Sequence, residues 1–199
     1  MKIICMGDSL TEGDYGIPGV RGTPNVKKEN YPYFLSFLTG AEVKNYGKCG
    51  FRASQYLDLY RTGEFNVEGA DFIIIMLGTN GGFDDKIDTP DNESFLSLLD
   101  SLENDAPSAK IVLCTPPHAT SNKAYVNHGY MPQILLAREF LRRVARDRKL
   151  PVIEVADCPD FCEENEHIMQ PNDGLHFGLL GYQTLAKFIY EELKSHKLI

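Results

Sequence analysis

Ser9, Asp173 and His176 are the residues whose types and spacing could perform chemistry on a carbonyl group. Ser9 follows Gly7 and Asp8 directly after an apolar run, which would present its hydroxyl at the beginning of a helix or tight turn. A serine hydroxyl is a weak nucleophile at neutral pH and needs a neighbouring base. Asp173 stands three residues before His176, and on one helical turn or tight loop this spacing brings a carboxylate alongside an imidazole. The three residues therefore suit a Ser-His-Asp triad in which Asp173 orients His176.

Acyl transfer also needs hydrogen-bond donors that face the oxygen on which negative charge develops. The backbone N–H groups of Ser9 and Gly50 and the side-chain amide of Asn80 could supply them from three different strand ends. Glycine suits such a position because its missing side chain lets a substrate approach the backbone. We therefore expect these three residues to form an oxyanion hole.

The elements that must position these residues alternate along the chain. The predicted strands, apolar for most of their length, are residues 2–6, 42–46, 72–77, 110–115 and 152–155. Helical spacing follows at residues 33–39, 53–61, 94–104, 133–149 and 181–194. This alternation is typical of a parallel sheet covered on both faces and predicts a three-layer, doubly wound α/β fold. The sequence has no linker or repeat, so we expect one domain over residues 1–199.

In such folds ligands bind at the carboxyl ends of the strands, where the strand order reverses. The segments after the first four predicted strands are residues 7–10, 47–50, 78–81 and 116–118. Ser9, Gly50 and Asn80 all lie in these segments, and His176 precedes the last predicted helix. We therefore expect the triad and the oxyanion donors to converge at one edge of the sheet.

These motifs resemble those of the SGNH, or GDSL, hydrolase superfamily, which is named for Ser, Gly, Asn and His in four blocks. The matching segments are Gly7-Asp8-Ser9-Leu10, Asn45-Tyr46-Gly47-Lys48-Cys49-Gly50, Gly78-Thr79-Asn80 and Asp173-Gly174-Leu175-His176. The resemblance spans residue 2 to about residue 195. It implies Ser9 as the nucleophile, Gly50 and Asn80 as oxyanion donors, and Asp173 and His176 as the rest of the triad. It also implies a flavodoxin-like five-stranded sheet and hydrolysis of esters or thioesters without a metal or organic cofactor.

One position departs from the family pattern. The third block usually continues with Asp after Asn, whereas Gly81 and Gly82 follow Asn80 here. The absent carboxylate is not one of the four naming residues, so catalysis is not excluded. Support for the loop that carries Asn80 must then come from elsewhere in the chain.

Two loops, residues 11–30 and 116–131, are longer than the fold requires. Loops of this length in a compact domain are usually functional. Both leave the same edge of the sheet as Ser9, so we expect them to form the walls that select the substrate. The expected contacts are Tyr15, Arg21 and Tyr125, with His118 also within reach, although an ordinary loop histidine is its simpler interpretation. We expect Glu12 and Asp14 to be solvated and Cys49 to be a small buried filler.

The composition disfavours other classes of protein. The net charge of -8 argues against nucleic acid as a partner. The longest apolar run, residues 72–77, is far shorter than the roughly 20 residues of a membrane helix, and residues 1–6 do not resemble a signal peptide. A cytoplasmic location is therefore expected if the chain begins naturally at Met1. The five cysteines are scattered without a Cys-x-x-Cys pair, which indicates neither a disulfide framework nor a metal site.

These observations predict a serine esterase that acts on a small-molecule ester through an acyl-enzyme. A short acyl group such as acetyl on a sugar is the preferred substrate, because no long apolar segment near the site resembles a lipid lid. A thioesterase or lysophospholipase of the same family is the alternative. A second alternative is a binding module that keeps the pocket but does not catalyse a reaction. Nucleotide binding at residues 7–9 is disfavoured by the lack of a phosphate-loop glycine pattern and lysine, and nothing in the sequence predicts an oligomeric state.

Overall fold

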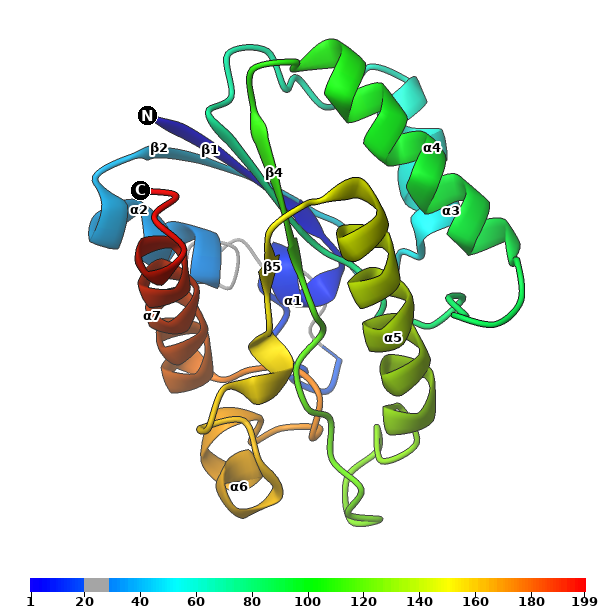
Figure 1. Ribbon diagram of the computed structural model, residues 1–199. Helices are drawn as coiled ribbons and strands as arrows, with labels where there is room; N and C mark the ends of the chain where they lie inside the picture. Colours follow the sequence, from blue (N-terminus) through cyan, green and yellow to red (C-terminus); the bar gives the residue numbers. More distant parts are fainter. Residues whose placement is uncertain (20–28) are drawn as a thin grey trace.

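A five-stranded, all-parallel sheet forms the centre of the computed structural model, which describes residues 1–19 and 29–199 (Figure 1). Its strands are β1 (Lys2–Gly7), β2 (Glu42–Gly47), β3 (Phe72–Met76), β4 (Lys110–Cys114) and β5 (Val152–Ile153). The spatial order is β2-β1-β3-β4-β5, so the chain runs from β1 outward to β2 and then crosses to β3 on the other side. The predicted doubly wound, flavodoxin-like α/β fold is confirmed.

The helices include all five that the sequence predicts and two short additional ones. They are α1 (Ser9–Glu12), α2 (Tyr31–Thr39), α3 (Ala53–Arg61), α4 (Pro90–Asp105), α5 (Met131–Arg148), α6 (Glu166–Met169) and α7 (Leu179–Ser195). Helices α2, α4 and α5 carry a proline in the first turn and begin two to four residues before the predicted start. Proline suits this position because its missing N–H would have no intrahelical acceptor there.

The fifth strand is shorter than predicted. Only Val152 and Ile153 pair with β4, and a 3₁₀ helix follows at Val155–Asp157. The side chain of Thr115, just after β4, accepts a hydrogen bond from the N–H of Ala156. This contact draws the backbone out of the sheet, so the apolar residue Val155 packs in the core without being part of a strand.

The apolar core has two halves, one on each face of the sheet. Helices α3, α4 and α5 cover one face, and α2 and α7 cover the other (Figure 1). Alternate residues of a strand point to opposite faces. Ile4 of β1 therefore packs with the first group of helices and Ile3 with the second. The need to fill both halves explains why the central strands are apolar throughout.

The register of the sheet brings the ends of the first three strands to one level. Gly7 at the end of β1 pairs with Gly47 on β2 and with Met76 on β3. The segments that follow these strands therefore leave the sheet side by side. No helix among the described residues is both long and apolar enough to span a lipid bilayer.

Candidate active site

Ser9 lies at a sharp turn between β1 and α1. It is the first residue of α1, and the Asp8 carboxylate caps the helix by accepting a 3.0 Å hydrogen bond from the N–H of Leu10. The helix ends after one turn at Gly13, whose φ of 101° is in the left-handed region that favours glycine. Ser9 is 2% exposed, so its hydroxyl is presented from a rigid, nearly buried position.

The side chains of Ser9, His176 and Asp173 form a continuous hydrogen-bonded chain. Nε2 of His176 lies 2.9 Å from the Ser9 Oγ, and Nδ1 lies 2.6 Å from Oδ2 of Asp173. Both distances suit hydrogen bonds. The structure thus brings together the three residues that the sequence predicts as a triad, although 167 positions separate Ser9 from His176.

The Asp173 carboxylate is held on both oxygens. Oδ1 accepts hydrogen bonds from the N–H groups of Leu175, at 3.0 Å, and His176, at 2.8 Å. Oδ2 accepts from the side-chain amide of Asn127, at 2.9 Å, in addition to the histidine ring. The carboxylate therefore has little rotational freedom and keeps the imidazole aimed at Ser9. Nothing in the sequence pattern singles out Asn127, because it comes from the loop before α5.

The protonation equilibria of the pair are coupled. Burial alone would lower the pKa of His176, but the hydrogen bond and charge of Asp173, together with the charges of Asp14 and Asp8, outweigh it and raise the pKa above the usual 6.5. Burial would raise the pKa of Asp173, yet its hydrogen bonds from His176 and Leu175 hold the pKa below its ordinary value. The arrangement favours an imidazolium beside a carboxylate, which is the charge state a histidine reaches after it takes a proton.

The predicted oxyanion donors lie beside this chain of side chains. Ser9, Gly50 and Asn80 line one cavity with His176. The N–H of Gly50 donates to no acceptor among the described residues, and that of Ser9, at the first helical position, has no intrahelical acceptor. The side-chain amide of Asn80 donates one hydrogen bond to the Phe51 carbonyl, at 3.0 Å, which fixes its orientation.

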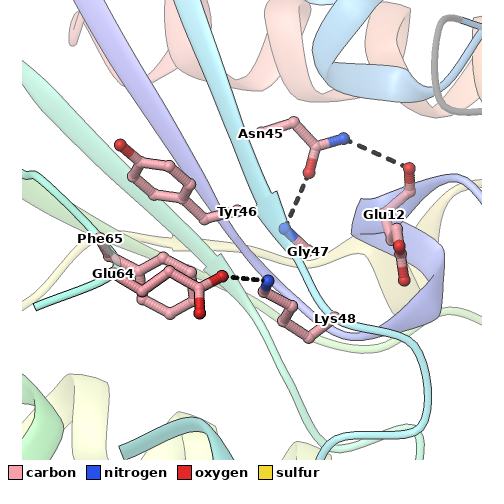
Figure 2. A pocket seen from close by; sticks show the side chains of 7 residues that line it. All are labelled: Glu12, Asn45, Tyr46, Gly47, Lys48, Glu64 and Phe65. Atoms are coloured by element: carbon pink, nitrogen blue, oxygen red, sulfur yellow. Dashed lines mark hydrogen bonds and ion pairs between the residues drawn. The ribbon is translucent and has the colours of Figure 1, made fainter. Parts of the chain in front are cut away.

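A polar network next to α1 holds the segment that leads to Gly50 (Figure 2). The Asn45 amide donates to the Thr11 carbonyl, at 2.7 Å, and its oxygen accepts from the N–H of Gly47, at 2.8 Å. The Glu12 carboxylate accepts from the N–H of Cys49, at 2.6 Å. Glu12 is thus not simply solvated as predicted. Its carboxylate links the segment that leads to Gly50, called the oxyanion segment below, to α1, the helix that carries Ser9.

The hollow drawn in Figure 2 has a volume of about 390 Å³. Two of its charged side chains pair with each other, since the Lys48 ammonium contacts the Glu64 carboxylate, and this ammonium lies 5.6 Å from the centre of the Phe65 ring. These contacts brace the outer side of the segment that ends at Gly50. We therefore assign this hollow a structural role.

The Asn80 loop is supported without the aspartate that the family usually has. Gly81 has a φ of 75°, and a Cβ there would come within 2.9 Å of the Gln133 side-chain oxygen. Gln133 occupies this space and donates a 2.7 Å hydrogen bond to the Thr79 carbonyl. Arg52 donates from Nε to the Asn80 carbonyl, at 3.0 Å. Side chains from α5 and the start of α3 thus replace the local carboxylate.

The catalytic cavity has a volume of about 300 Å³, and both predicted loops line it. From the first loop come Asp14 and Ile17, and from the second come Asn127 and Tyr130. Asp14 is 7% exposed, because its neighbours fold over it, so the expectation that it is solvated was wrong. Cys49 also lines the cavity and is half-buried, with its Sγ 3.3 Å from the Asp14 carboxylate.

Three of the four predicted substrate contacts do not line this cavity. Tyr15 does not line the cavity, since its ring packs 5.3 Å from that of Tyr182 and its hydroxyl donates to the Glu29 carbonyl. Tyr125 and His118 are likewise absent from the lining, and burial lowers the pKa of His118. Arg21 lies outside the described residues. No cluster of His, Cys, Asp and Glu side chains in the described ranges could hold a metal ion.

Comparison with known proteins places this fold and its motifs in one family. The model of the GDSL-like lipase/acylhydrolase family matches residues 5–184. The chain therefore belongs to this family, whose description is one of ester hydrolases. A search of curated proteins found no match.

Solved structures of esterases share the fold. A lipase/acylhydrolase from Enterococcus faecalis has 24% identity and a TM-score of 0.70, with 98% of this chain and 96% of that one covered. The aryl esterase of M. smegmatis has 20% identity and a TM-score of 0.69, with 98% of both chains covered. Est24, a carbohydrate acetylesterase from Sinorhizobium meliloti, has 18% identity and a TM-score of 0.66, again with 98% of both chains covered.

Proposed function

We propose that this protein hydrolyses carboxylic esters of short acyl groups through an acyl-enzyme on Ser9. The observation that carries the proposal is the hydrogen-bonded chain from Ser9 through His176 to Asp173, with distances of 2.9 and 2.6 Å. A nucleophile, a base within its reach and a third group that orients the base are the parts that nucleophilic catalysis requires.

In the first half-reaction, Nε2 of His176 takes the proton of the Ser9 hydroxyl as Oγ attacks the acyl carbon. The N–H groups of Ser9 and Gly50 and the Asn80 amide stabilise the resulting oxyanion. His176 then gives the proton to the alcohol oxygen as the bond between that oxygen and the acyl carbon breaks, so the alcohol leaves and the acyl group stays on Ser9 Oγ. Asp173 stabilises the imidazolium throughout and is not itself protonated.

In the second half-reaction, water takes the place of the alcohol. His176 removes a proton from the water as its oxygen attacks the acyl carbon, and the same donors hold the second oxyanion. Return of the proton to Ser9 Oγ releases the acid. Apart from the substrate and this water, the proposed steps use side chains and backbone groups of the chain.

The cavity supports a small ester that carries polar groups. Its volume of about 300 Å³ is at the small end of ligand sites, and Asp14, Asn127 and Tyr130 give its walls polar groups. Carbohydrate O-acetyl esters are therefore our first candidate substrates, and Est24 is described as a carbohydrate acetylesterase. A thioesterase or a lysophospholipase remains the alternative within the family.

Chain-length dependence tests this proposal directly. We expect wild type to react with a fluorophosphonate probe and to hydrolyse p-nitrophenyl acetate and butyrate faster than the octanoate and palmitate esters. Ser9→Ala should lose the labelling and lower kcat by roughly 10⁴-fold or more, as for other triad nucleophiles. Parallel assays with acetylated sugars, acyl-CoAs and lysophospholipids would identify the substrate class. Absence of both labelling and ester cleavage in folded wild type would instead indicate a binding module without turnover.

A further inference from the structure

A second hollow adjoins the catalytic cavity. It has a volume of about 590 Å³ and shares Gly50, Asn80 and Tyr130 with that cavity. Gly50 and Asn80 are two of the three proposed oxyanion donors. A substrate whose carbonyl oxygen lies between them can therefore extend into the second hollow. The residues that line only the second hollow include Arg52, Val126, His128 and Gln133.

The two spaces carry opposite charge. Asp14 and Asp173 line the catalytic cavity, whereas the second hollow has no acidic side chain in its lining and contains the Arg52 guanidinium. Nε of Arg52 donates to the Asn80 carbonyl, but among the described residues no carboxylate forms an ion pair with this guanidinium. An unpaired arginine is notable in a chain with a net charge of -8. Its terminal nitrogens retain donors in a fork that matches a carboxylate.

The position of His176 indicates which part of the ester enters which space. The leaving alcohol oxygen must accept a proton from Nε2 of His176, so it must lie within hydrogen-bond reach of that atom. His176 lines the catalytic cavity and not the second hollow. The alcohol part therefore stays beside His176, and the acyl part extends past Gly50 and Asn80.

We propose that the second hollow is an acyl-binding subsite in which Arg52 binds an anionic group at the far end of a short acyl chain. This inference rests on the proposed ester hydrolysis and deepens it, since it ranks half-esters of dicarboxylic acids above uncharged acyl esters. A guanidinium can bind a carboxylate through two parallel hydrogen bonds. The carboxylates of Asp14 and Asp173 would repel the same anion from the catalytic cavity, which disfavours the reversed orientation.

Pairs of esters that differ only in charge test the subsite. We would measure kcat/KM for the p-nitrophenyl half-esters of succinate and glutarate and for the p-nitrophenyl esters of butyrate and valerate, which have acyl chains of equal length. Spontaneous hydrolysis, which a neighbouring carboxylate accelerates, is subtracted with Ser9→Ala. The readout is the charged-to-uncharged ratio, because loss of the Arg52 contact with Asn80 can slow both esters alike.

We expect a ratio above one for wild type at one or both chain lengths and a roughly tenfold lower ratio for Arg52→Gln, as for loss of a charge-assisted hydrogen bond. Arg52→Lys should restore part of the ratio because it keeps the charge. Arg61→Gln makes the same charge change at the other end of α3, at an exposed position, and should match wild type.

Two results would overturn the inference: an Arg52→Gln ratio equal to that of wild type, or a wild type that prefers the uncharged ester at both chain lengths. Either result, together with Ser9-dependent cleavage of the uncharged esters, leaves the proposed esterase intact. Failure of the esterase itself has a different signature, since neither ester would then be cleaved and Ser9 would not react with the fluorophosphonate.

Discussion

The contact between Asp173 and His176 determines how the activity should depend on pH. Neutral His176 is the base in the proposed mechanism, and its pKa lies above 6.5 because the Asp173 hydrogen bond and the nearby carboxylate charges outweigh burial. We therefore expect kcat/KM for an uncharged ester to rise with pH and to reach half its maximum above pH 6.5. Measurement of kcat/KM from about pH 5 to 9 would check this.

Asp173→Asn tests the cause of that shift. Without the carboxylate, only the charges of Asp14 and Asp8 oppose the effect of burial on the pKa of His176, so the inflection should move to lower pH, and kcat should fall by about 10⁴-fold. Asp58→Asn, at an exposed position on α3, is the matched control and should keep the wild-type profile. An inflection that stays in place in Asp173→Asn would contradict the assigned role of this residue.

The ionisation of Asp8 should make the stability of the protein depend on pH. It is fully buried, and burial raises its pKa to about 6, against the effect of the hydrogen bond from the N–H of Leu10. Between about pH 4 and 6 the folded state keeps a proton that the unfolded state loses, so the free energy of unfolding falls as pH rises through this window. Above about pH 6 Asp8 is ionised in both states, and the free energy of unfolding falls no further on its account.

Asp8→Asn removes this penalty and keeps an oxygen that can cap α1. We expect it to raise the free energy of unfolding by about 1 to 3 kcal/mol near pH 7.5, with a gain that shrinks toward pH 4. Urea denaturation at the two pH values measures this, with Asp88→Asn at an exposed position as the control. An equal effect of Asp8→Asn at both pH values would show that its ionisation is not the cause.

At the scale of elements, the contact between β2 and α1 determines the position of Ser9 relative to the oxyanion segment. A Cβ on Gly47 would collide with the backbone N of Glu12, whereas a Cβ on Gly50 would meet nothing within 4 Å. Gly50 instead has a φ of 78°, which is unfavourable for other residues. The two glycines are therefore required for different physical reasons.

Alanine substitutions should separate these reasons. Gly50→Ala should cost about 1 to 2 kcal/mol of stability through backbone strain. Gly47→Ala should lower the melting temperature further, because overpacking against backbone costs about 1 to 3 kcal/mol or more, and should also reduce kcat by displacing α1. Gly129→Ala, with open space and no positive φ, is the control for stability. A Gly47→Ala protein as stable as the Gly129 variant would be inconsistent with a close contact between β2 and α1.

At the scale of the whole molecule, the two halves of the core share the same central strands. We propose that residues 1–199 unfold as one cooperative domain. Leu99 on α4 and Leu185 on α7 are fully buried on opposite faces of the sheet. Leu99→Ala and Leu185→Ala should each cost about 2 to 5 kcal/mol and each shift a single calorimetric transition. Two separate transitions in either variant would argue for independent units.

The sheet and the proximity of Ser9, Asp173 and His176 were predictable from the sequence because both follow from local patterns and the topology they imply. Apolar runs identify the strands, and the residues just after them, such as Ser9 and Asn80, follow directly from the topology. Helix α1 was not predicted as a defined helix, because one turn is too short to show periodicity and depends on the Asp8 cap. Helix α1 ends after one turn because Gly13 adopts a left-handed backbone conformation.

The loop residues that line the cavity were not predictable, because the direction of a loop side chain depends on distant partners. Tyr15 turns toward Tyr182, which lies near the other end of the chain, and Asp14 beside it faces the cavity instead. The carbonyl of Asp14 accepts a 2.6 Å hydrogen bond from the Tyr182 hydroxyl. No local pattern around residues 14 and 15 encodes this contact.

The wide separation of Ser9 and His176 in the chain has a consequence for biosynthesis. Within this chain, Ser9 is made 167 residues before His176, and Asp173 also follows only after β5 and α6. Domains are synthesised from the N-terminus at about 5 to 20 residues per second, so a nascent chain carries Ser9 for roughly 8 to 33 seconds before His176 exists. Throughout that interval Ser9 lacks its proposed base, so we expect an incomplete chain to show none of the proposed esterase activity.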